Sequence, residues 1–211
     1  MAMISLAVPT GALLEDSLDL FRRAGLIDLE RQELGRRLLV EHNGIRLVLV
    51  RPSDVPAYVD HGAADLGVVG KDTLWEVPTG HYELVNLGFG GCQLVMAVPA
   101  ESELGEPAGW PAMLRVGSKY PLATANFMRQ VGQTVEVVRL SGSVELAPLV
   151  GLVDAIVDLT ATGKTLRENQ LRVVAEVDFS TARLIANQAS LKTRSDGVQA
   201  VVSKIRQALD R

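Results

Sequence analysis

The stretch that most constrains the fold of this 211-residue chain runs from Glu145 to Leu166 and reads ELAPLVGLVDAIVDLTATGKTL. Within it, residues 155–157 have the composition of a buried strand and lead directly into Asp158 and a turn rich in threonine and glycine. The amide and hydroxyl groups of such a turn, helped by the start of a following helix, can converge on an anion. The stretch therefore predicts a phosphate-binding loop at the carboxyl end of a strand, over residues 158–165.

The letters GKT at residues 163–165 match the end of a Walker A loop, but the rest of that motif is missing. The motif requires a glycine five residues before Gly163, where this chain has Asp158. The segment therefore predicts a phosphate-binding loop that begins with a carboxylate, Asp158. It suits a sugar phosphate, with the phosphate on the amides and the ribose hydroxyls on the carboxylate. The alternative is a helix N-terminus capped by Thr160 or Thr162, which needs no ligand.

Elsewhere, short apolar runs alternate with helical patterns, which predicts an α/β protein with a largely parallel sheet covered by helices. Strands are expected at residues 3–8, 38–41, 45–50, 66–69, 93–98, 115–118, 134–139, 155–157, 171–177 and 182–186. Helices are expected at residues 13–23, 55–61, 73–76, 121–131, 145–153 and 196–209, the second of them capped by Asp54.

The glycines within residues 88–91 permit backbone angles that suit a hinge or a crossover. We therefore expect two lobes, residues 1–91 with 181–211 and residues 92–180, with the ligand in the cleft at the strand ends. A single continuous sheet is the alternative.

Composition restricts the class of protein further. Hydrophobic residues make up 47% and charged residues 22% of the chain, as in ordinary compact soluble proteins. A net charge of −4 gives no general attraction to nucleic acid. The single cysteine, Cys92, fits a reducing compartment, and neither an export signal nor a membrane-spanning stretch is visible. These features predict a soluble cytoplasmic protein that binds neither nucleic acid nor membrane.

Several charged residues outside the loop are further candidates. Arg51 ends an apolar strand, where an arginine either meets an anion or pairs with a neighbouring acid. Glu145 follows a Ser-Gly-Ser turn and either serves a ligand or stabilises a helix start; Asp154 is interpreted as structural. Either acid could hold Mg²⁺ bound to a pyrophosphate. Because Mg²⁺ commonly keeps water and substrate oxygens as ligands, we expect no dense metal-binding cluster.

A pair of arginines, a group of glycines and the three histidines are weaker candidates for a ligand site, because each has a structural explanation. One of the adjacent cations Arg36 and Arg37 is expected on a solvated surface. The glycines within residues 65–72 would admit a flat ligand such as a purine, or simply form tight turns. The three histidines lack metal-ligand spacing and are expected at the surface.

The loop residues and their surroundings resemble the short form of ATP phosphoribosyltransferase, the family that opens histidine biosynthesis. The family's pattern, in which a glutamate, a glycine, Asp-hydrophobic and Thr-Gly-x-Thr-Leu follow at fixed spacing, matches at Glu145, Gly151, Asp158, Leu159, Thr162, Gly163, Thr165 and Leu166. Further similar segments lie at residues 51–56, 62–72, 87–94, 118–121 and 183–190, so nearly the whole chain is covered. Val153 stands where a small residue is usual.

The resemblance implies a two-lobed fold similar to periplasmic binding proteins, with the active site between the lobes. It implies that phosphoribosyl pyrophosphate is bound by Glu145, Asp158, Thr160, Ala161, Thr162, Gly163, Lys164 and Thr165. Arg36, Arg51, Asp72 and Gly90 are the expected nucleotide-binding residues, and Arg51 and Asp158 the expected catalytic ones. The first strand departs from the family, because Thr10 and Ala12 replace a lysine and an arginine, which puts phosphate contacts from that loop in question.

The resemblance further implies catalytic-subunit dimers and a hetero-oligomer with a regulatory subunit related to histidyl-tRNA synthetase, which would mediate histidine feedback. The expected reaction transfers phosphoribosyl from phosphoribosyl pyrophosphate to the adenine ring of ATP, with Mg²⁺ held mainly through substrate phosphates. A ring nitrogen needs no strong protein base, so positioning and charge stabilisation are the expected catalytic means. The alternatives are a catalytically degenerate or non-enzymatic two-lobed nucleotide-binding subunit, and a type I phosphoribosyltransferase, which Leu159 in place of a second acid disfavours.

Overall fold

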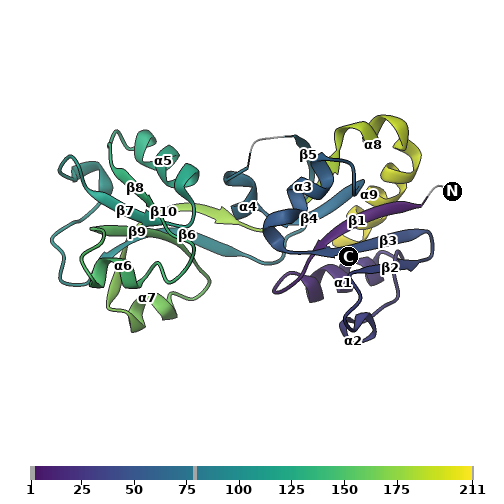
Figure 1. Cartoon of the computed structure of the whole chain (residues 1–211), viewed down its shortest axis with the longest axis horizontal. Coiled ribbons are helices and arrows are strands. Elements are labelled where there is room, and N and C mark those ends of the chain that lie inside the picture. Colours follow the sequence, from purple (N-terminus) through teal and green to yellow (C-terminus); the bar gives the residue numbers. More distant parts are fainter. Residues whose placement is uncertain (1–2, 78–79, 211) are drawn as a thin grey trace. The chain divides into compact units, whose positions relative to one another are not determined.

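The computed structural model describes residues 3–77 and 80–210 and consists of two compact units (Figure 1). Unit 1 comprises Met1–Gly90 and Thr181–Arg211, and unit 2 comprises Gly91–Ser180. The chain thus crosses from one unit to the other twice, at residues 90–91 and 180–181. The first crossing lies one residue before the predicted boundary.

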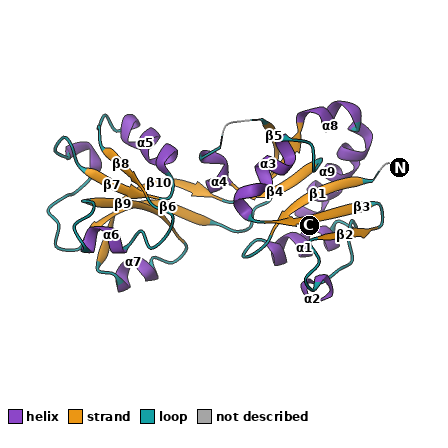
Figure 2. Cartoon of the chain, in the orientation of Figure 1, coloured by secondary structure: helices purple, strands orange, loops and turns teal. Residues whose placement is uncertain are grey.

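Unit 1 is built on a six-stranded sheet (Figure 2). Its strands, in spatial order, are β2 (Leu39–His42), β3 (Ile45–Val50), β1 (Ile4–Pro9), β4 (Leu66–Gly70), β11 (Ala182–Asn187) and β5 (His81–Asn86). Strands β3, β1 and β4 are parallel, whereas β2 pairs antiparallel with β3, and β11 pairs antiparallel with both β4 and β5. The sheet is therefore mixed, and the prediction of a largely parallel sheet was wrong.

Apolar side chains on both faces of this sheet hold its helices. Helices α1 (Leu14–Arg23) and α9 (Ser195–Leu209) contribute to one core cluster, together with alternate residues of the strands. Helix α3 (Val55–Asp60) contributes Val55 and Val59 to a second cluster with other strand residues. Alternation along each strand places its side chains on the two faces in turn, so a sheet covered by helices on both faces needs apolar residues throughout its central strands.

Unit 1 also contains shorter helices, of which α8 leads from the last strand into α9. They are α2 (Arg31–Leu34), a 3₁₀ helix at Pro52–Asp54, α4 (Lys71–Trp75) and α8 (Gln188–Thr193). Asp54 is the N-cap residue of α3, as predicted, but its side chain forms no capping hydrogen bond. The 3₁₀ turn leads directly into α3, and the Asp54 carboxylate accepts a hydrogen bond from the Ser53 hydroxyl at 3.1 Å instead.

Unit 2 contains a five-stranded mixed sheet. Its strands, in spatial order, are β10 (Leu171–Ser180), β6 (Cys92–Pro99), β9 (Ala155–Thr160), β7 (Arg115–Ser118) and β8 (Glu136–Arg139). Strands β9, β7 and β8 are parallel, and β6 is antiparallel to both of its neighbours. The connecting helices are a 3₁₀ turn at Pro107–Gly109, α5 (Pro121–Gln130), α6 (Leu146–Leu149) and α7 (Lys164–Glu168).

Two predicted boundaries around the phosphate loop were wrong. Strand β9 does not end at residue 157 but continues to Thr160, because its last residues still pair with β6, Asp158 opposite Val95 and Thr160 opposite Gln93. The helix expected over residues 145–153 is a single turn, α6, and Gly151 with φ of 71° lies just beyond its end. A glycine in the left-handed conformation is a common way to end a helix.

None of the helices in the described part of the chain is long and apolar enough to cross a membrane.

Candidate active site

Residues of the predicted phosphate loop lie at one edge of the unit 2 sheet. Because β8, β7 and β9 are parallel, their carboxyl ends meet at this edge. Strand β8 leads into the Ser-Gly-Ser turn before Glu145, β7 leads into Lys119, and β9 leads into the loop 161–163. Ligands of open α/β sheets commonly bind at such strand ends.

The loop itself is held in shape by its own threonines. The Thr160 hydroxyl accepts a hydrogen bond from the Gly163 amide at 2.7 Å, and the Thr162 hydroxyl accepts one from the Lys164 amide at 3.4 Å. Gly163 has φ of 68°, a conformation that other residues adopt at a cost. The N-cap residue of α7 is Gly163, and no side chain caps the helix, so the alternative of a cap by Thr160 or Thr162 is wrong. Ala161, Thr162 and Thr165 are exposed. Hydroxyls and amides of an ordered, exposed turn are suited to an anion.

Asp158 lies in β9, two residues before the strand ends, and is partly buried. Its Oδ1 accepts a hydrogen bond from the Leu159 amide at 2.8 Å. Burial raises the pKa of the Asp158 carboxyl above its usual value, and the charge of Glu145 raises it further; the Leu159 amide and the charge of Lys119 act in the opposite direction. The charges of Glu145 and Lys119 thus act on Asp158 in opposite directions.

Lys119 is the site residue that sequence reasoning missed. Ser118 is paired with Val157 in parallel register, so the residues that follow, Lys119 and Asp158, are neighbours at the carboxyl edge. The Ser118 hydroxyl donates to the Val157 carbonyl oxygen at 2.7 Å and accepts from the Tyr120 amide at 2.9 Å. This buried bridge fixes the backbone on both sides of Lys119. The signal was available, because Lys119 directly follows a predicted strand.

Other charged residues of unit 2 lie outside this arrangement. The Asp154 carboxylate accepts a hydrogen bond from the Arg115 amide at 2.8 Å, at the amino end of β9 and therefore at the opposite edge, in agreement with a structural role. The ammonium group of Lys164 is exposed and lies 3.7 Å from the Glu168 carboxylate. The positive charge of Lys164 is thus paired with Glu168 on the surface of α7.

The four residues predicted to bind a nucleotide all lie at one edge of the unit 1 sheet. Arg51 follows β3 and Asp72 lies in α4, directly after the parallel strand β4. Arg36 approaches the same edge, since the Leu38 carbonyl oxygen accepts a hydrogen bond from the Leu49 amide at 2.8 Å. Gly90 follows Phe89, whose carbonyl oxygen accepts from the Ala182 amide at 2.9 Å. All four positions therefore lie where β3 and β4 end and β11 begins.

Arg51 is an available cation at this edge. It is exposed, and its guanidinium forms no hydrogen bond or ion pair with residues 3–77 or 80–210. The Thr10 amide donates to the Val50 carbonyl oxygen at 2.8 Å, so the position that lacks the family's lysine lies beside Arg51. Of the adjacent pair, Arg37 bonds to the carbonyl oxygens of Glu33 and Leu34, and Arg36 is exposed.

Two glycines considered for purine contact have a packing explanation. A Cβ atom on Gly67 would lie 2.8 Å from Val55 and 2.7 Å from Val59, so the absence of a side chain lets α3 pack closely on β4. A Cβ atom on Gly70 would overlap the carboxylate of Asp72. The neighbouring Lys71 ammonium is paired with Glu83 at 2.6 Å, and Glu83 also binds Arg183 at 3.2 Å.

The predicted surface position of the histidines was wrong for His81. Its side chain is only 5% exposed, and its Nδ1 lies 2.9 Å from Asp60 Oδ1, because the pair bridges β5 and the end of α3. Within residues 3–77 and 80–210, no three His, Cys, Asp or Glu side chains are arranged to hold a metal ion.

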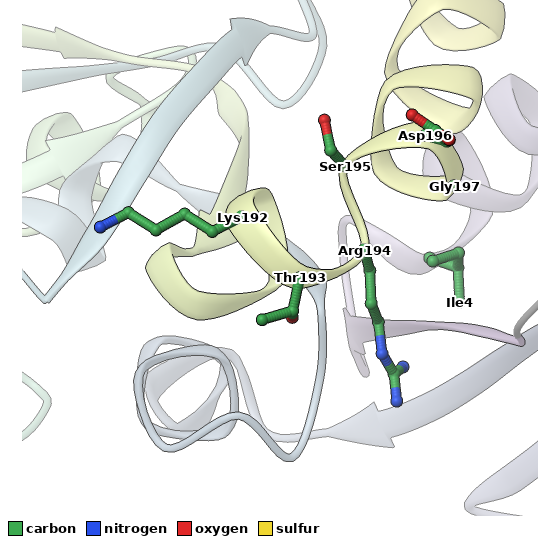
Figure 3. A pocket seen from close by; sticks show the side chains of 7 residues that line it. All are labelled: Ile4, Lys192, Thr193, Arg194, Ser195, Asp196 and Gly197. Atoms are coloured by element: carbon green, nitrogen blue, oxygen red, sulfur yellow. The ribbon is translucent and has the colours of Figure 1, made fainter.

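A cavity of about 540 Å³ opens elsewhere in unit 1 (Figure 3). It is lined by Ile4 and by Lys192, Thr193, Arg194, Ser195, Asp196 and Gly197, where α8 leads into α9. Ile4 begins β1, so the cavity lies at the amino end of the strand, opposite the end that leads to Thr10. It contains none of the predicted site residues.

Comparison with known proteins agrees with the sequence resemblance. The family model described as ATP phosphoribosyltransferase (HisG) matches residues 51–207. The chain is 43% identical to an ATP phosphoribosyltransferase of Caldanaerobacter subterraneus subsp. tengcongensis, over 100% of this chain and 99% of the relative. It is also similar to a chain of the ATP phosphoribosyl transferase (HisG:HisZ) complex from Thermotoga maritima, with 32% identity, a TM-score of 0.82 and 99% of each chain covered.

A more distant similarity concerns the fold alone. The alkanesulfonate-binding protein SsuA from Xanthomonas axonopodis pv. citri has a TM-score of 0.58 at 17% identity, covering 99% of this chain and 73% of that protein. This confirms the expected two-lobed α/β fold of periplasmic binding proteins. The family match spans more than half of the chain and the curated relative matches along its whole length, so the chain belongs to the ATP phosphoribosyltransferase family, the transferases of the first step of histidine biosynthesis.

Proposed function

We propose that the carboxyl edge of unit 2 binds phosphoribosyl pyrophosphate, the donor of the transfer. The turn 160–165, in which Thr162 and Thr165 are exposed, receives the 5-phosphate, and the carboxylates of Asp158 and Glu145 accept hydrogen bonds from the ribose hydroxyls. The observation that carries this proposal is the ordered turn with left-handed Gly163, directly beside two carboxylates. Each hydrogen bond to a charged group contributes about 1.5–3 kcal/mol.

The phosphoribosyl transfer requires no general base from the protein. The acceptor is a neutral ring nitrogen of adenine, so no protein base has to create the nucleophile. The C1–pyrophosphate bond breaks as the C1–nitrogen bond forms, and the bonding electrons leave with pyrophosphate. Residues that orient the donor and stabilise the departing charge are therefore sufficient. This agrees with a site made of cations, carboxylates and hydroxyls.

Mg²⁺ fits this donor-binding edge only as an ion shared with the substrate. Asp158 and Glu145 offer oxygen ligands, which Mg²⁺ prefers, but a pair of carboxylates leaves most of its octahedral positions to water and to phosphate oxygens. When bound, the ion would neutralise charge on the pyrophosphate. The protein residues would orient the donor and hold the carboxylates in place.

For the acceptor, we propose that Arg51 and Arg36 bind phosphate groups of ATP, with Asp72 and Gly90 at the same edge of unit 1. Arg51 has no partner among the described residues, and a guanidinium forms bidentate bonds to phosphate. Thr10 and Ala12 remove two cations from the adjacent turn. The nucleotide phosphates consequently depend more on Arg51 than they would in a relative that keeps the lysine and the arginine.

The Thermotoga maritima relative assembles as a HisG:HisZ complex. By analogy, we propose that this chain forms dimers and works with a regulatory subunit related to histidyl-tRNA synthetase, which would mediate inhibition by histidine.

An assay with and without that subunit tests the proposed function. The purified chain is mixed with ATP, phosphoribosyl pyrophosphate and Mg²⁺, and the absorbance of the product is followed. Product formation that increases when the subunit is added supports an active catalytic chain. Binding of both substrates without product in either mixture supports the second candidate, a degenerate nucleotide-binding subunit, which the loss of cations at Thr10 and Ala12 favours.

A further inference from the structure

Two cations of unit 1 converge on the carboxylate of Glu83, close to the edge proposed to bind ATP. The Lys71 ammonium lies 2.6 Å from Glu83 Oε2, and Arg183 Nη1 lies 3.2 Å from Glu83 Oε1. The three residues come from different elements, because Lys71 begins α4, Arg183 lies in β11 and Glu83 lies in β5. Since β11 lies between β4 and β5, Glu83 connects the outer strand of the sheet to the residue that follows β4.

The position of Arg183 suits an apolar side chain better than a charged one. Arg183 shares a face of β11 with Ile185 and pairs with Val69 of β4, and both of these residues belong to an apolar core cluster. The Arg183 side chain is 19% exposed, and its Nε atom is buried without a hydrogen-bond partner in the described part of the chain. A largely buried ion pair commonly stabilises a fold no more than apolar residues of similar size would. Stability alone therefore does not explain the pair of Arg183 and Glu83.

Helix α4 depends on contacts of this kind for its position. It has five residues, too few for a helix to be stable by itself. Its first residue, Lys71, is fixed twice, because its amide donates to the Thr181 carbonyl oxygen at 3.0 Å and its ammonium donates to Glu83. The next residue is Asp72, whose carboxylate lies so close to Gly70 that a Cβ atom there would overlap it. The contact between Lys71 and Glu83 therefore bears directly on where Asp72 lies.

We propose that Glu83 is a positioning residue for the acceptor nucleotide. By pairing with Lys71 and Arg183, its carboxylate holds the start of α4 beside β11 and thereby keeps Asp72 where the nucleotide meets it. The inference rests on the proposed binding of ATP at this edge, with Asp72 as one of its contacts. It also accounts for an arginine in an apolar setting, because Arg183 holds Glu83 from the side of β11.

The expected signature is a loss of affinity for ATP alone. Glu83→Gln keeps nearly the same shape but removes the negative charge that holds the two cations. It should weaken ATP binding roughly tenfold, which corresponds to the loss of one hydrogen bond to the nucleotide. Binding of phosphoribosyl pyrophosphate should not change, because the loop 158–165 lies in unit 2. A residue that only stabilised unit 1 would lower its unfolding free energy and leave the ATP affinity of the folded protein unchanged.

Separate calorimetric titrations of the full-length chain with ATP and with phosphoribosyl pyrophosphate test the inference. Glu41→Gln is the matched control, because Glu41 forms an ion pair of 2.8 Å with Arg46 in the same sheet. Arg46 lies near the start of β3, and Arg51 follows the end of that strand. The control variant should therefore bind ATP as the wild type does. Urea unfolding shows that each variant is folded under the conditions of the titration.

Lys71→Met separates action through Lys71 from other routes. If Glu83 works by holding Lys71, Lys71→Met should weaken ATP binding as much as Glu83→Gln does, and the double variant should show no further loss. A larger loss for Lys71→Met that persists in the Glu83→Gln background overturns the inference and shows that Lys71 contacts the nucleotide itself. Equal weakening of ATP and phosphoribosyl pyrophosphate binding by Glu83→Gln overturns it as well.

Asp72→Asn distinguishes failure of the inference from failure of the proposed function. If Asp72→Asn binds ATP weakly and Glu83→Gln binds it normally, the inference fails, but the proposed nucleotide contact of Asp72 stands. If Asp72→Asn binds ATP normally, Asp72 is not a contact of the nucleotide, and the inference fails together with that part of the proposed function.

Discussion

Replacing Asp65 by asparagine should destabilise unit 1 by about 3 kcal/mol without touching the candidate active site. Asp65 is 3% exposed and immediately precedes β4, at the amino edge of the sheet. Its carboxylate accepts hydrogen bonds from the Ser5 amide at 2.8 Å, the Ser5 hydroxyl at 2.9 Å and the Ser190 hydroxyl at 2.7 Å. Arg194 Nη1 lies 3.0 Å from Oδ2. One carboxylate thus joins β1, α8 and the start of α9.

The expected loss of unfolding free energy depends on how exposed each group bonded to Asp65 is. Asparagine keeps the shape and one acceptor oxygen but turns an NH₂ group toward donors, so at least one donor loses its bond. A hydrogen bond to a charged group contributes about 1.5–3 kcal/mol, and a buried donor left unpaired costs a further 1–3 kcal/mol or so. Arg194 is 47% exposed and regains water, so its share is small. Arg194→Met should therefore cost only about 1 kcal/mol, which makes it the matched comparison.

The same geometry sets the pH dependence. Burial alone would raise the pKa of Asp65, but the hydrogen bonds from Ser5 and Ser190 and the charge of Arg194 outweigh it and lower the pKa below the ordinary value. A carboxyl whose folded pKa is lowered stabilises the fold above the unfolded value, and this contribution disappears as the pH falls through the folded value. The stability difference between wild type and Asp65→Asn should be constant above roughly pH 5 and shrink below roughly pH 4.

Urea unfolding followed by tryptophan fluorescence can assign the effect to one unit. The chain has two tryptophans, Trp75 in α4 of unit 1 and Trp110 in unit 2. In a Trp110→Phe background the transition reports unit 1, and Asp65→Asn should lower its free energy of unfolding. A loss below about 1 kcal/mol, or one equal to that of Arg194→Met, would refute the reasoning that the buried hydrogen bonds dominate.

Three further outcomes concern the candidate site. Gly163→Ala places a Cβ atom 2.9 Å from Arg167 Nη1 at φ of 68°, so it should lower the unfolding free energy by about 1 kcal/mol in urea and weaken donor binding in calorimetry. Asp158→Asn should raise the melting temperature at pH 7, since burial and Glu145 raise the pKa of this carboxyl and the charged form costs stability. That gain should vanish as the pH is lowered through the raised pKa, because wild type then binds the proton, while donor affinity falls roughly tenfold at pH 7. Arg51→Ala should lower kcat by roughly a hundredfold but weaken nucleotide binding less, and equal losses in both would contradict a role in the transition state.

Local sequence patterns predicted most elements of the fold correctly. Strand 115–118 has the predicted bounds, and α1 and α9 differ from the prediction by one residue at the start. The two helices have strong periodicity, which depends only on neighbouring residues. The direction of the strands was mispredicted, because pairing between distant segments decides it. Strand β11 enters the unit 1 sheet from far along the chain, antiparallel to β4, and no local pattern records that.

In the candidate site, too, features that depend on neighbouring residues were predicted, and features that depend on pairing between distant segments were not. The turn 160–163 and Arg51 follow from residue types next to apolar runs. The sequence places Lys119 directly after a predicted strand, but only the pairing of that strand with β9 places it beside Asp158. His81 was assigned to the surface because it lacks metal-ligand spacing, and its contact with Asp60, 21 residues earlier, could not be read from local sequence. In each case the missing information was a pairing across the fold.

Both candidate edges share one property that follows from pairings inside each unit. In unit 2, Ser180 pairs with Cys92, and Gln93 pairs with Thr160, so the donor loop lies at the edge where the chain enters and leaves that unit. In unit 1, Arg183 pairs with Asn86 and Ala182 pairs with Gly70, so the crossings lie at the edge that carries Asp72. The crossings at residues 90–91 and 180–181 are thus anchored by the same strand ends that position the candidate binding residues. A substitution that shifts β6 or β11 in register should disturb the crossing and the site together, because one set of backbone hydrogen bonds holds both.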